Sequence, residues 1–253
     1  MTYAVNKRLP YLSIIVPVHN EQTRIRQAVF KIIRWAEQFI GEYEIILVEN
    51  GSADETFAIA RELSHIYRPV QALQVDGRSK AAAVRFGMLM ARGEYRYMCD
   101  VDLSTPIDEL SRFLKVLRGR DGWDIVVGSR EHPASQVKTS LKRWAIGRTF
   151  NMLVSLYTGL DYHDTQCGFK LFNRRSAEDI FNQVACISMA FDVEVLYIAS
   201  QRGYSVMELP VIWYNDTDSR VRLVRDSWSM FRDLQRIRKM HATQPEMALR
   251  SNT

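Results

Sequence analysis

The first 130 residues alternate between short apolar runs and longer amphipathic segments, and this alternation limits the fold more than any other feature. Runs with the length and composition of β-strands occupy residues 11–18, 43–49, 70–75, 94–99 and 124–128. Segments with helical spacing of apolar residues lie between them, for example at residues 21–40 and 79–91. Strands that alternate with helices form a mostly parallel sheet covered by helices on both faces. We therefore predict an α/β fold.

Local signals mark where two of these helices begin. Ser52 and Glu55 have the spacing of a capping box for the helix after the second strand. Thr105 is a candidate N-cap, with Pro106 at the first helical position and Asp108 close to the capping-box position. Both predicted helices therefore start directly after a loop that follows a strand.

The composition is that of a soluble globular protein. The chain has 253 residues, of which 47% are apolar and 25% charged, enough for one large domain or two small ones. Cys99, Cys167 and Cys186 are far apart and form no Cys-x-x-Cys pair, which argues against a disulfide framework or a zinc site and favours a reducing compartment. No apolar run reaches the roughly 18 residues that span a bilayer, and no signal peptide is recognisable.

The positive charge is concentrated in two segments. The net charge is +5, yet residues 130–148 alone carry five basic side chains against one acidic, and residues 219–239 carry seven against two. Such clusters indicate a localised anionic partner, either phosphate groups or an anionic membrane surface. Nucleic acid is not the expected partner, because no nucleic-acid-binding motif is present.

Asp100 and Asp102 follow the strand-like run at residues 94–99 and precede a predicted helix. In open α/β sheets, ligands bind at this carboxyl edge of the strands. Two ionised carboxylates so close together repel each other unless a cation lies beside them. One or two carboxylates together with substrate phosphates commonly hold a hard divalent ion. The alternative is a pair of solvated loop acids.

Three further loops follow predicted strands, at residues 17–21, 49–54 and 76–80. If the strands are neighbours in a parallel sheet, these loops and the Asp100 loop meet at one edge. That edge combines acids with Lys80 or Arg78, a combination that suits a nucleoside diphosphate. The glycine motifs of dinucleotide enzymes and of P-loop kinases are absent, which disfavours both classes.

The pattern changes after residue 128. Residues 135–160 predict a long helix with a wide apolar stripe, and residues 224–240 predict a second amphipathic helix with Trp228 and Phe231 on one side and arginines on another. Stripes of this kind either pack against a protein core or lie in a membrane interface with the basic face toward lipid headgroups. Residues 243–253 are expected to be a disordered tail.

These segments resemble a known family. The sequences at residues 16–21, 49–54 and 100–106 are similar to the three N-terminal motifs of family 2 glycosyltransferases, which have the GT-A fold. Gly128, Ser129 and Arg130 resemble the Gly-Ser-Arg of the polyprenyl-phosphate branch of that family. The resemblance runs in the same order along residues 12–241.

Three other segments resemble the dolichyl-phosphate β-glucosyltransferases within that branch. They are residues 164–172 (DTQCGFKLF), 190–196 (AFDVEVL) and 79–85 (SKAAAVR). The resemblance implies one GT-A domain over residues 1–242, with a nucleotide-sugar half at about 11–130 and an acceptor and membrane-facing half at about 131–242.

The resemblance also implies a donor site. The residues expected around the nucleotide are Pro17, His19, Glu21, Glu49, Asn50, Lys80, Asp100 and Asp102. Asp100 and Asp102 are expected to engage Mg²⁺ or Mn²⁺, with Asp102 nearer the sugar and Ser104 close by. Two departures from the family pattern concern this site: Asn50 replaces an acid, and the glycines that flank the loop lysine are replaced by Ser79 and Ala81.

For the acceptor site, the resemblance implies that Arg130 and Arg143 bind a lipid phosphate and act in catalysis with the two aspartates. Asp164 and Gln166 are expected to line the sugar or acceptor site. Ser219 and Arg220 resemble the Ser-Lys of a C-terminal loop that closes on the diphosphate, with arginine in place of lysine. His163 is expected to be structural, and Cys167 to pack rather than to act as a nucleophile.

The implied activity is an inverting transfer of glucose from UDP-glucose to a polyprenyl phosphate, dolichyl or undecaprenyl, by a peripheral enzyme on the cytoplasmic face of a membrane. The amphipathic segments or a partner protein would provide the membrane contact. Alternatives within the fold are another donor such as GDP-mannose, or a soluble acceptor. An alternative of another class is a catalytically inactive nucleotide-sugar-binding protein. The oligomeric state, including a homo-oligomer, is left open.

Overall fold

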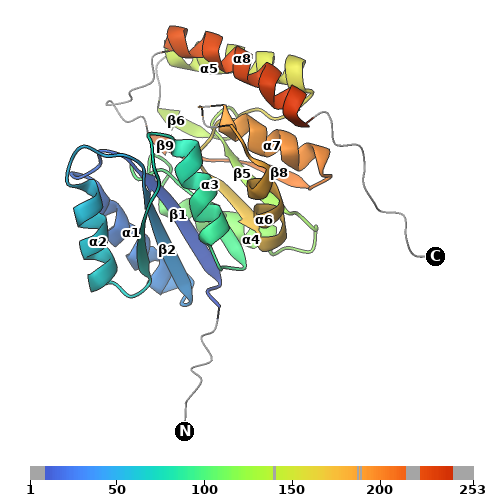
Figure 1. The fold of residues 1–253 in the computed structure, drawn as a ribbon. Coiled ribbons are helices and arrows are strands. Elements are labelled where there is room, and N and C mark those ends of the chain that lie inside the picture. The colour runs from blue at the N-terminus through green and yellow to red at the C-terminus, as the bar shows by residue number, and fades with distance from the viewer. Residues whose placement is uncertain (1–8, 139–140, 187, 189, 215–222, 242–253) are drawn as a thin grey trace.

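The computed structural model describes residues 9–138, 141–186, 188, 190–214 and 223–241. Its first half alternates strands and helices as the sequence predicts (Figure 1). The strands are β1 (Leu12–Val18), β2 (Tyr43–Glu49), β3 (Val70–Gln74), β4 (Tyr95–Met98) and β5 (Ile125–Ser129). The helices are α1 (Ile25–Phe39), α2 (Thr56–Ile66), α3 (Lys80–Met90) and α4 (Leu110–Leu117), the last after a 3₁₀ turn at Ile107–Glu109. Each strand begins and ends within about one residue of its predicted bounds.

The second half adds shorter strands and longer helices. They are β6 (Gln136–Lys138), α5 (Leu141–Thr158), β7 (Lys170–Asn173), α6 (Arg174–Gln183), α7 (Phe191–Gln201), β8 (Val206–Pro210), β9 (Ile212–Tyr214) and α8 (Leu223–His241). In the described part of the chain, seven strands form one sheet in the order β3-β2-β1-β4-β7-β5-β8, and β6 pairs with β9. Every pair in the seven-stranded sheet is parallel except the two pairs that β7 makes. The predicted mostly parallel α/β sheet is therefore confirmed.

Alternate residues of each central strand supply two separate cores. Leu12, Ile14 and Val16 of β1 pack with α1, α2 and α4, whereas Ile15 packs on the other face with α3, α6 and α7. This follows from the two-residue period of a strand, because successive side chains point to opposite faces of the sheet. All four β1 side chains are fully buried, so the sheet is covered on both faces, as a parallel sheet requires.

Strand β7 runs opposite to its neighbours β4 and β5. The carboxyl ends of β4 and β5 therefore lie at the same edge as the amino end of β7. The residues that lead into β7, 164–169, consequently lie between the loop that follows β4 and the loop that follows β5. The sequence pattern did not predict this strand, and its position decides which residues meet at the edge.

Two predicted helix starts are wrong in detail. Ser52 does not cap α2; its hydroxyl accepts the Asn20 N–H at 3.0 Å, and Asp54 instead accepts the Thr56 N–H at 3.0 Å. Likewise, Pro106 rather than Thr105 precedes the 3₁₀ turn, with no side-chain cap. In both places a contact in the loop, or the fixed backbone angle of proline, takes precedence over the local signal.

The long helix predicted from residue 135 begins only at Leu141. The residues before it form β6, which pairs with β9, and the Gln136 N–H donates to the Val211 carbonyl at 3.0 Å. Ser135 fixes the junction, because its hydroxyl accepts the Val211 N–H at 3.1 Å. Pairing with a distant strand therefore replaces the first turns of the predicted helix.

Helices α5 and α8 lie side by side across the top of the molecule in Figure 1. Leu234 and Ile237 of α8 are buried, and they share a core with Val154 of α5 and with α7. Part of the apolar face predicted for each of these two helices therefore packs in the protein core. The side chains of Trp228 and Phe231, and the tail at residues 243–253, lie outside the described part of the structure. Among the described residues, no helix is both long and apolar enough to cross a membrane.

Candidate active site

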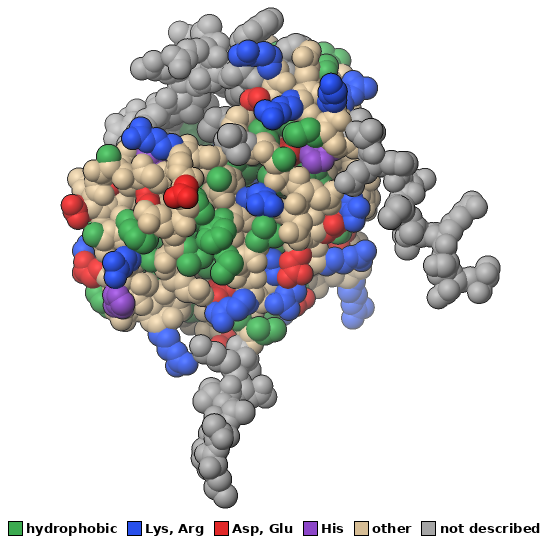
Figure 2. Space-filling model, in the orientation of Figure 1, with side chains coloured by type: hydrophobic (Ala, Val, Ile, Leu, Met, Phe, Trp, Pro, Cys, Tyr) green, Lys and Arg blue, Asp and Glu red, His purple; other side chains and the backbone are tan. Residues whose placement is uncertain are grey.

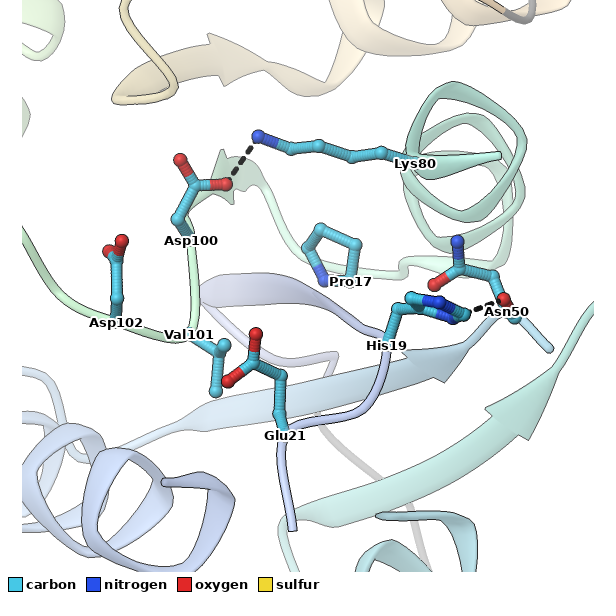
Figure 3. A pocket seen from close by; sticks show the side chains of 8 residues that line it. All are labelled: Pro17, His19, Glu21, Asn50, Lys80, Asp100, Val101 and Asp102. Atoms are coloured by element: carbon cyan, nitrogen blue, oxygen red, sulfur yellow. Dashed lines mark hydrogen bonds and ion pairs between the residues drawn. The ribbon is translucent and has the colours of Figure 1, made fainter. Parts of the chain in front are cut away.

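A cavity of about 210 Å³ lies at the carboxyl edge of the sheet, as Figure 3 shows. Its lining comes from the end of β1, from the loops after β1, β2 and β4 and from the start of α3: Pro17, His19, Glu21, Asn50, Lys80, Asp100, Val101 and Asp102. The parallel order β3-β2-β1-β4 brings these segments together, as expected for loops that follow neighbouring parallel strands. Seven of the eight residues predicted to bind the nucleotide line this cavity.

The eighth, Glu49, does not line the cavity. Its buried carboxylate accepts the Ser52 N–H and the side-chain amide of Gln74, the latter at 2.7 Å. Burial raises the pKa of Glu49, but the hydrogen bonds from Ser52 and Gln74 outweigh it and hold the pKa below its usual range. Glu49 therefore stabilises the loop after β2, and this loop places Asn50 at the cavity wall.

The first two loops are held together by short hydrogen bonds. His19 Nδ1 lies 2.9 Å from the Asn50 carbonyl oxygen, and the Asn20 side chain accepts the Ala53 N–H at 2.8 Å. Asn20 has a φ of 54°, a conformation that asparagine tolerates better than most residues. The wall that carries His19 and Asn50 is therefore fixed before any ligand binds.

Lys80 and Asp100 form an ion pair across the cavity (Figure 3). Ser79 positions the lysine, because its hydroxyl accepts the Ala82 N–H at 3.1 Å and caps α3, as predicted for a helix that starts here. Burial lowers the pKa of Lys80, but the carboxylates of Asp100, Asp192 and Asp102 outweigh it, so the pKa lies above its usual range. The lysine is therefore charged at neutral pH.

The two acids of the loop after β4 differ electrostatically. Burial raises the pKa of Asp100, but the positive charges of Lys80, Lys170 and Arg130 outweigh it and lower the pKa. The pKa of Asp102 is raised, first by burial and then by the negative charge of Asp100. Asp102 Oδ1 accepts the Ser104 N–H at 2.9 Å, which places Ser104 beside the pair. The negative charge on Asp102 is therefore less completely balanced than that on Asp100.

This charge distribution fits a divalent cation. The described residues contain no group of three or more His, Cys, Asp or Glu side chains that could hold a metal ion. Two carboxylates in one loop nevertheless supply the hard oxygen ligands that Mg²⁺ and Mn²⁺ prefer, and substrate phosphates and water commonly complete such a shell. A cation here would also lower the pKa of Asp102, because it favours the ionised carboxylate.

Arg130 follows β5 and is held by Asp164. Its Nε and Nη2 donate to the two carboxylate oxygens at 2.6 and 3.0 Å, and its backbone N–H donates to Oδ2 at 3.0 Å. The Trp213 ring centre lies 5.7 Å from the guanidinium carbon. The Asp164 side chain is 2% exposed and that of Arg130 32%, so part of the arginine side chain stays accessible. Burial raises the pKa of Asp164, but the charge and hydrogen bonds of Arg130 outweigh it and lower the pKa.

Glu208 fixes Asp164 in turn and was not predicted. Its carboxylate accepts the backbone N–H groups of His163 and Asp164 at 3.0 and 2.8 Å, and it lies 2.9 Å from His163 Nδ1. His163, expected to be structural without an identified partner, is therefore paired. The signal that pointed to this region was the resemblance at residues 164–172, which does not include Glu208.

Lys170 and Asp192 form a buried ion pair near Asp100. Lys170 Nζ donates to Asp192 Oδ1 at 2.5 Å and to the Cys167 carbonyl at 2.6 Å, and the Lys170 side chain is 0% exposed. Both charged residues belong to segments that carry the family resemblance, but no sequence pattern predicts that they form a pair. Cys167 is buried, and burial, followed by the charge of Asp164, raises the pKa of its thiol to about 11. A protonated buried thiol agrees with packing rather than nucleophilic attack.

The structure describes only part of the remaining predicted site residues. The Gln166 N–H donates to Asp164 Oδ1 at 3.1 Å, so the backbone of Gln166 belongs to the Arg130 side of the site. Arg143 lies in α5, but its side chain is outside the description. Ser219 and Arg220 also lie outside the described residues. Their predicted roles stay predictions.

Comparison with protein families identifies the group to which these features belong. The model of "Glycosyl transferase family 2" matches residues 13–181, more than half of the chain. The chain belongs to glycosyltransferase family 2. It is accordingly a glycosyltransferase, and the matched range contains the cavity, Arg130 and Asp164.

Curated relatives extend the similarity over most of the chain. A dolichyl-phosphate beta-glucosyltransferase of Drosophila melanogaster is 35% identical over 239 residues, which are 88% of this chain and 73% of the relative. The dolichyl-phosphate beta-glucosyltransferase ALG5C of Trichomonas vaginalis is 35% identical over 225 residues, 84% of this chain and 66% of the relative. The chain thus spans about two thirds to three quarters of the length of these relatives.

A solved structure supports the fold of this family 2 glycosyltransferase. Glucosyl-3-phosphoglycerate synthase from Mycobacterium tuberculosis, in complex with Mn²⁺, UDP and phosphoglyceric acid, matches with a TM-score of 0.64 over 94% of this chain and 80% of that chain, at 15% identity. At this identity the likeness concerns the fold alone, and it confirms the GT-A type of α/β fold.

The pair Arg130–Asp164 allows a test of the site that needs no substrate. We expect Asp164→Asn to lower the free energy of unfolding at neutral pH by about 1–3 kcal/mol, because it removes the charge that faces Arg130. The range allows for screening at the partly exposed arginine. The exposed neighbour Asp161→Asn is the control and should change stability by less than about 0.5 kcal/mol.

The pH dependence gives the sign of this effect. The pKa of Asp164 is lowered in the folded protein, so its contribution is full above the unfolded value of about 4 and is lost as pH falls through the folded pKa. Urea unfolding from about pH 7 to about pH 3 should therefore show wild type and Asp164→Asn converging in stability at acid pH. A difference that stays constant to the lowest pH would contradict the ion pair.

Proposed function

We propose that this family 2 glycosyltransferase moves glucose from UDP-glucose to a polyprenyl phosphate, dolichyl or undecaprenyl, with inversion at the anomeric carbon. An oxygen of the lipid phosphate forms a bond to the anomeric carbon, and the bond from that carbon to the diphosphate breaks, releasing UDP. The names of the curated relatives support the glucosyl group and the lipid acceptor. UDP as the donor nucleotide is our own assignment.

The observation that carries this proposal is the pairing of two different sites at one sheet edge. Carboxylates and Lys80 line the cavity after β4, and a fixed arginine, Arg130, follows β5 two strands away in the sheet order. The positive charge of Arg130 lowers the pKa of Asp100, so the two sites are electrostatically connected. A reaction between two phosphate-bearing substrates needs this combination.

On the donor side, Pro17, His19, Glu21 and Asn50 would enclose the nucleoside, and Lys80 would contact the diphosphate. A charged lysine stabilises the negative charge that grows on the diphosphate as its bond to the sugar breaks. Asp100 holds Lys80 in place before the donor arrives. Asp102 and Ser104 would contact the sugar that follows the diphosphate.

Asp100 and Asp102 would hold the divalent ion, Mg²⁺ or Mn²⁺. When bound, such an ion supplies Lewis-acid neutralisation of the leaving diphosphate. The raised pKa of Asp102 supports this assignment, because a cation beside Asp102 would balance its negative charge. A solved fold neighbour that binds both Mn²⁺ and UDP agrees with this assignment.

On the acceptor side, Arg130 and Arg143 would bind the lipid phosphate. Arginine suits this task because its planar guanidinium donates two parallel hydrogen bonds to phosphate oxygens. Asp164 occupies one edge of Arg130 and leaves the outer edge for the acceptor. The phosphate is already an anion at neutral pH, so little general-base catalysis is required.

Membrane contact would come from α5 and α8, on the cytoplasmic face. Met152, Leu153 and Leu156 of α5 are exposed, Leu156 at 77%. Arg232 and Arg236 of α8, the helix that contacts α5, are also exposed. Figure 2 shows Lys and Arg side chains together with hydrophobic ones at the top of the visible face. Apolar side chains flanked by basic ones suit an anionic lipid surface. We further propose that residues 1–242 act as one GT-A domain.

A donor screen tests the function directly. Radiolabelled UDP-glucose and GDP-mannose are each offered with a short polyprenyl phosphate or with a water-soluble phosphate monoester. We expect label to enter the lipid only from UDP-glucose. Labelling from GDP-mannose would overturn the donor, and a labelled soluble product would overturn the acceptor. Nucleotide-sugar binding without any product would instead favour a binding protein.

Replacing one acid tests the metal. Asp102→Asn should keep the fold and lose at least about 90% of transfer activity, because it removes a charged ligand and a charge-assisted contact costs about 1.5–3 kcal/mol. Wild-type activity should vanish in excess EDTA and return with Mg²⁺ or Mn²⁺. Full wild-type activity in EDTA would contradict the assignment of a metal site. Asp108→Asn, an exposed acid six residues later, is the matched control.

Replacing one arginine tests the acceptor site. Arg143→Ala should weaken use of polyprenyl phosphate by about ten- to a hundredfold, the loss expected for one charge-assisted phosphate contact. Binding of UDP should stay nearly unchanged. Arg120→Ala removes an exposed positive charge before β5, far from the carboxyl edge, and should alter neither quantity. Unchanged acceptor kinetics in Arg143→Ala would show that the acceptor site is misplaced.

A further inference from the structure

The segment that leads into β7 touches both halves of the site. Asp164 at its start holds Arg130, and Gly168 near its end lies directly against Asp100. A β-carbon built on Gly168 would lie 2.7 Å from Asp100 Oδ2, 3.3 Å from Cγ and 3.6 Å from Oδ1. The first distance is shorter than any ordinary contact between a β-carbon and another atom. The carboxylate therefore occupies the space that a side chain at position 168 would fill.

The backbone on both sides of Gly168 is fixed. On one side, the buried Lys170 ammonium donates to the Cys167 carbonyl at 2.6 Å and is itself held by Asp192. On the other side, the Phe169 ring lies 4.7 Å from the rings of Tyr97 and Phe113. The Phe169 carbonyl also accepts the Gly128 N–H at 2.8 Å. Any crowding at position 168 must therefore be relieved by Asp100 and not by the chain.

Asp100 is able to move. Its side chain is 43% exposed and faces the cavity, and Lys80 is its charged partner there. Rotation of this partly exposed carboxylate breaks its ion pair with Lys80 but displaces no buried backbone, so it costs less than movement of the chain at position 168. The same rotation removes the carboxylate from Lys80 and from Asp102.

We propose that Gly168 is a positioning residue for the donor site: its missing side chain sets the place of the Asp100 carboxylate that engages Lys80 and the cation. The inference rests on the proposed nucleotide-sugar function. It assigns a role in donor binding to a segment that otherwise serves the acceptor arginine. One rigid stretch, from Asp164 to Lys170, then fixes the geometry of both substrates.

Gly168→Ala separates positioning from structure. Because the crowded atom ends a movable side chain, the melting temperature should change by less than about 2 °C. Affinity for UDP in the presence of Mn²⁺, measured by calorimetry, should fall at least about tenfold, because Asp100 leaves its place. Unchanged affinity would overturn the proposal.

Gly87→Ala is the matched control with the opposite expectation. Gly87 lies in α3, and its added β-carbon would meet the buried side chains of Ile15 at 2.6 Å and Val48 at 3.0 Å. Overpacking there should lower the melting temperature by roughly 2–10 °C and leave Mn²⁺–UDP affinity of the folded protein unchanged. If Gly168→Ala lowers the melting temperature as much as Gly87→Ala, or does not fold, the role of Gly168 is structural and the proposal is wrong.

A double-mutant cycle identifies the residue through which Gly168 acts. In an Asp100→Ala background, Gly168→Ala should weaken Mn²⁺–UDP binding no further. Additive losses would overturn the proposal, because Gly168 would then act on something else. Crystal structures of wild type and Gly168→Ala decide the case without a ligand: a displaced Asp100 carboxylate supports the inference, and an unmoved one overturns it. Failure of the wild type to bind any nucleotide would count against the proposed function alone.

Discussion

Charge balance at the carboxyl edge of the sheet is the constraint on which this site depends. Burial favours the neutral form of a carboxylate, yet Asp100 stays ionised because Lys80, Lys170 and Arg130 surround it. Asp102, two residues further on, has a raised pKa, first because of burial and then because of the negative charge of Asp100. The edge is therefore asymmetric: the protein itself satisfies one acid, and the other depends on what binds. In the proposed function, that asymmetry would give a cation and a diphosphate a preferred place before either arrives.

The reversal of β7 makes this balance achievable. Had β7 run parallel to its neighbours, its lead-in would have emerged at the opposite edge of the sheet, and Asp164 would not reach Arg130. In the observed direction, the lead-in crosses between the loops that follow β4 and β5. The buried pair Lys170–Asp192 then fixes that crossing from inside the protein. Breaking one partner of such a pair is costly, so the pair maintains a precise geometry even where it contributes little net stability.

The sequence predicted the parallel half of the sheet well because β-branched and aromatic runs between turns leave little choice of structure. It also brought the acids and Lys80 to one edge through topology alone. It missed β7, since this strand is short and begins with a charged residue, Lys170, whose burial depends on a partner more than twenty residues away. It did not separate Glu49 from the residues that line the cavity, because a carboxylate that binds a ligand and one that accepts hydrogen bonds from Ser52 look the same in a sequence.

The connection between the two sites is the last consequence of this arrangement. The proposed transfer from a nucleotide sugar to a lipid phosphate would bring two anions together, and their repulsion is strong in a poorly solvated cavity. If the cationic side chains were flexible, ordering them around the substrates would cost free energy and weaken binding. Here Arg130 is held by a segment that also abuts Asp100, and Asp100 holds Lys80. The two cations are thus ordered by the same piece of backbone during folding, so the reaction need not order them again.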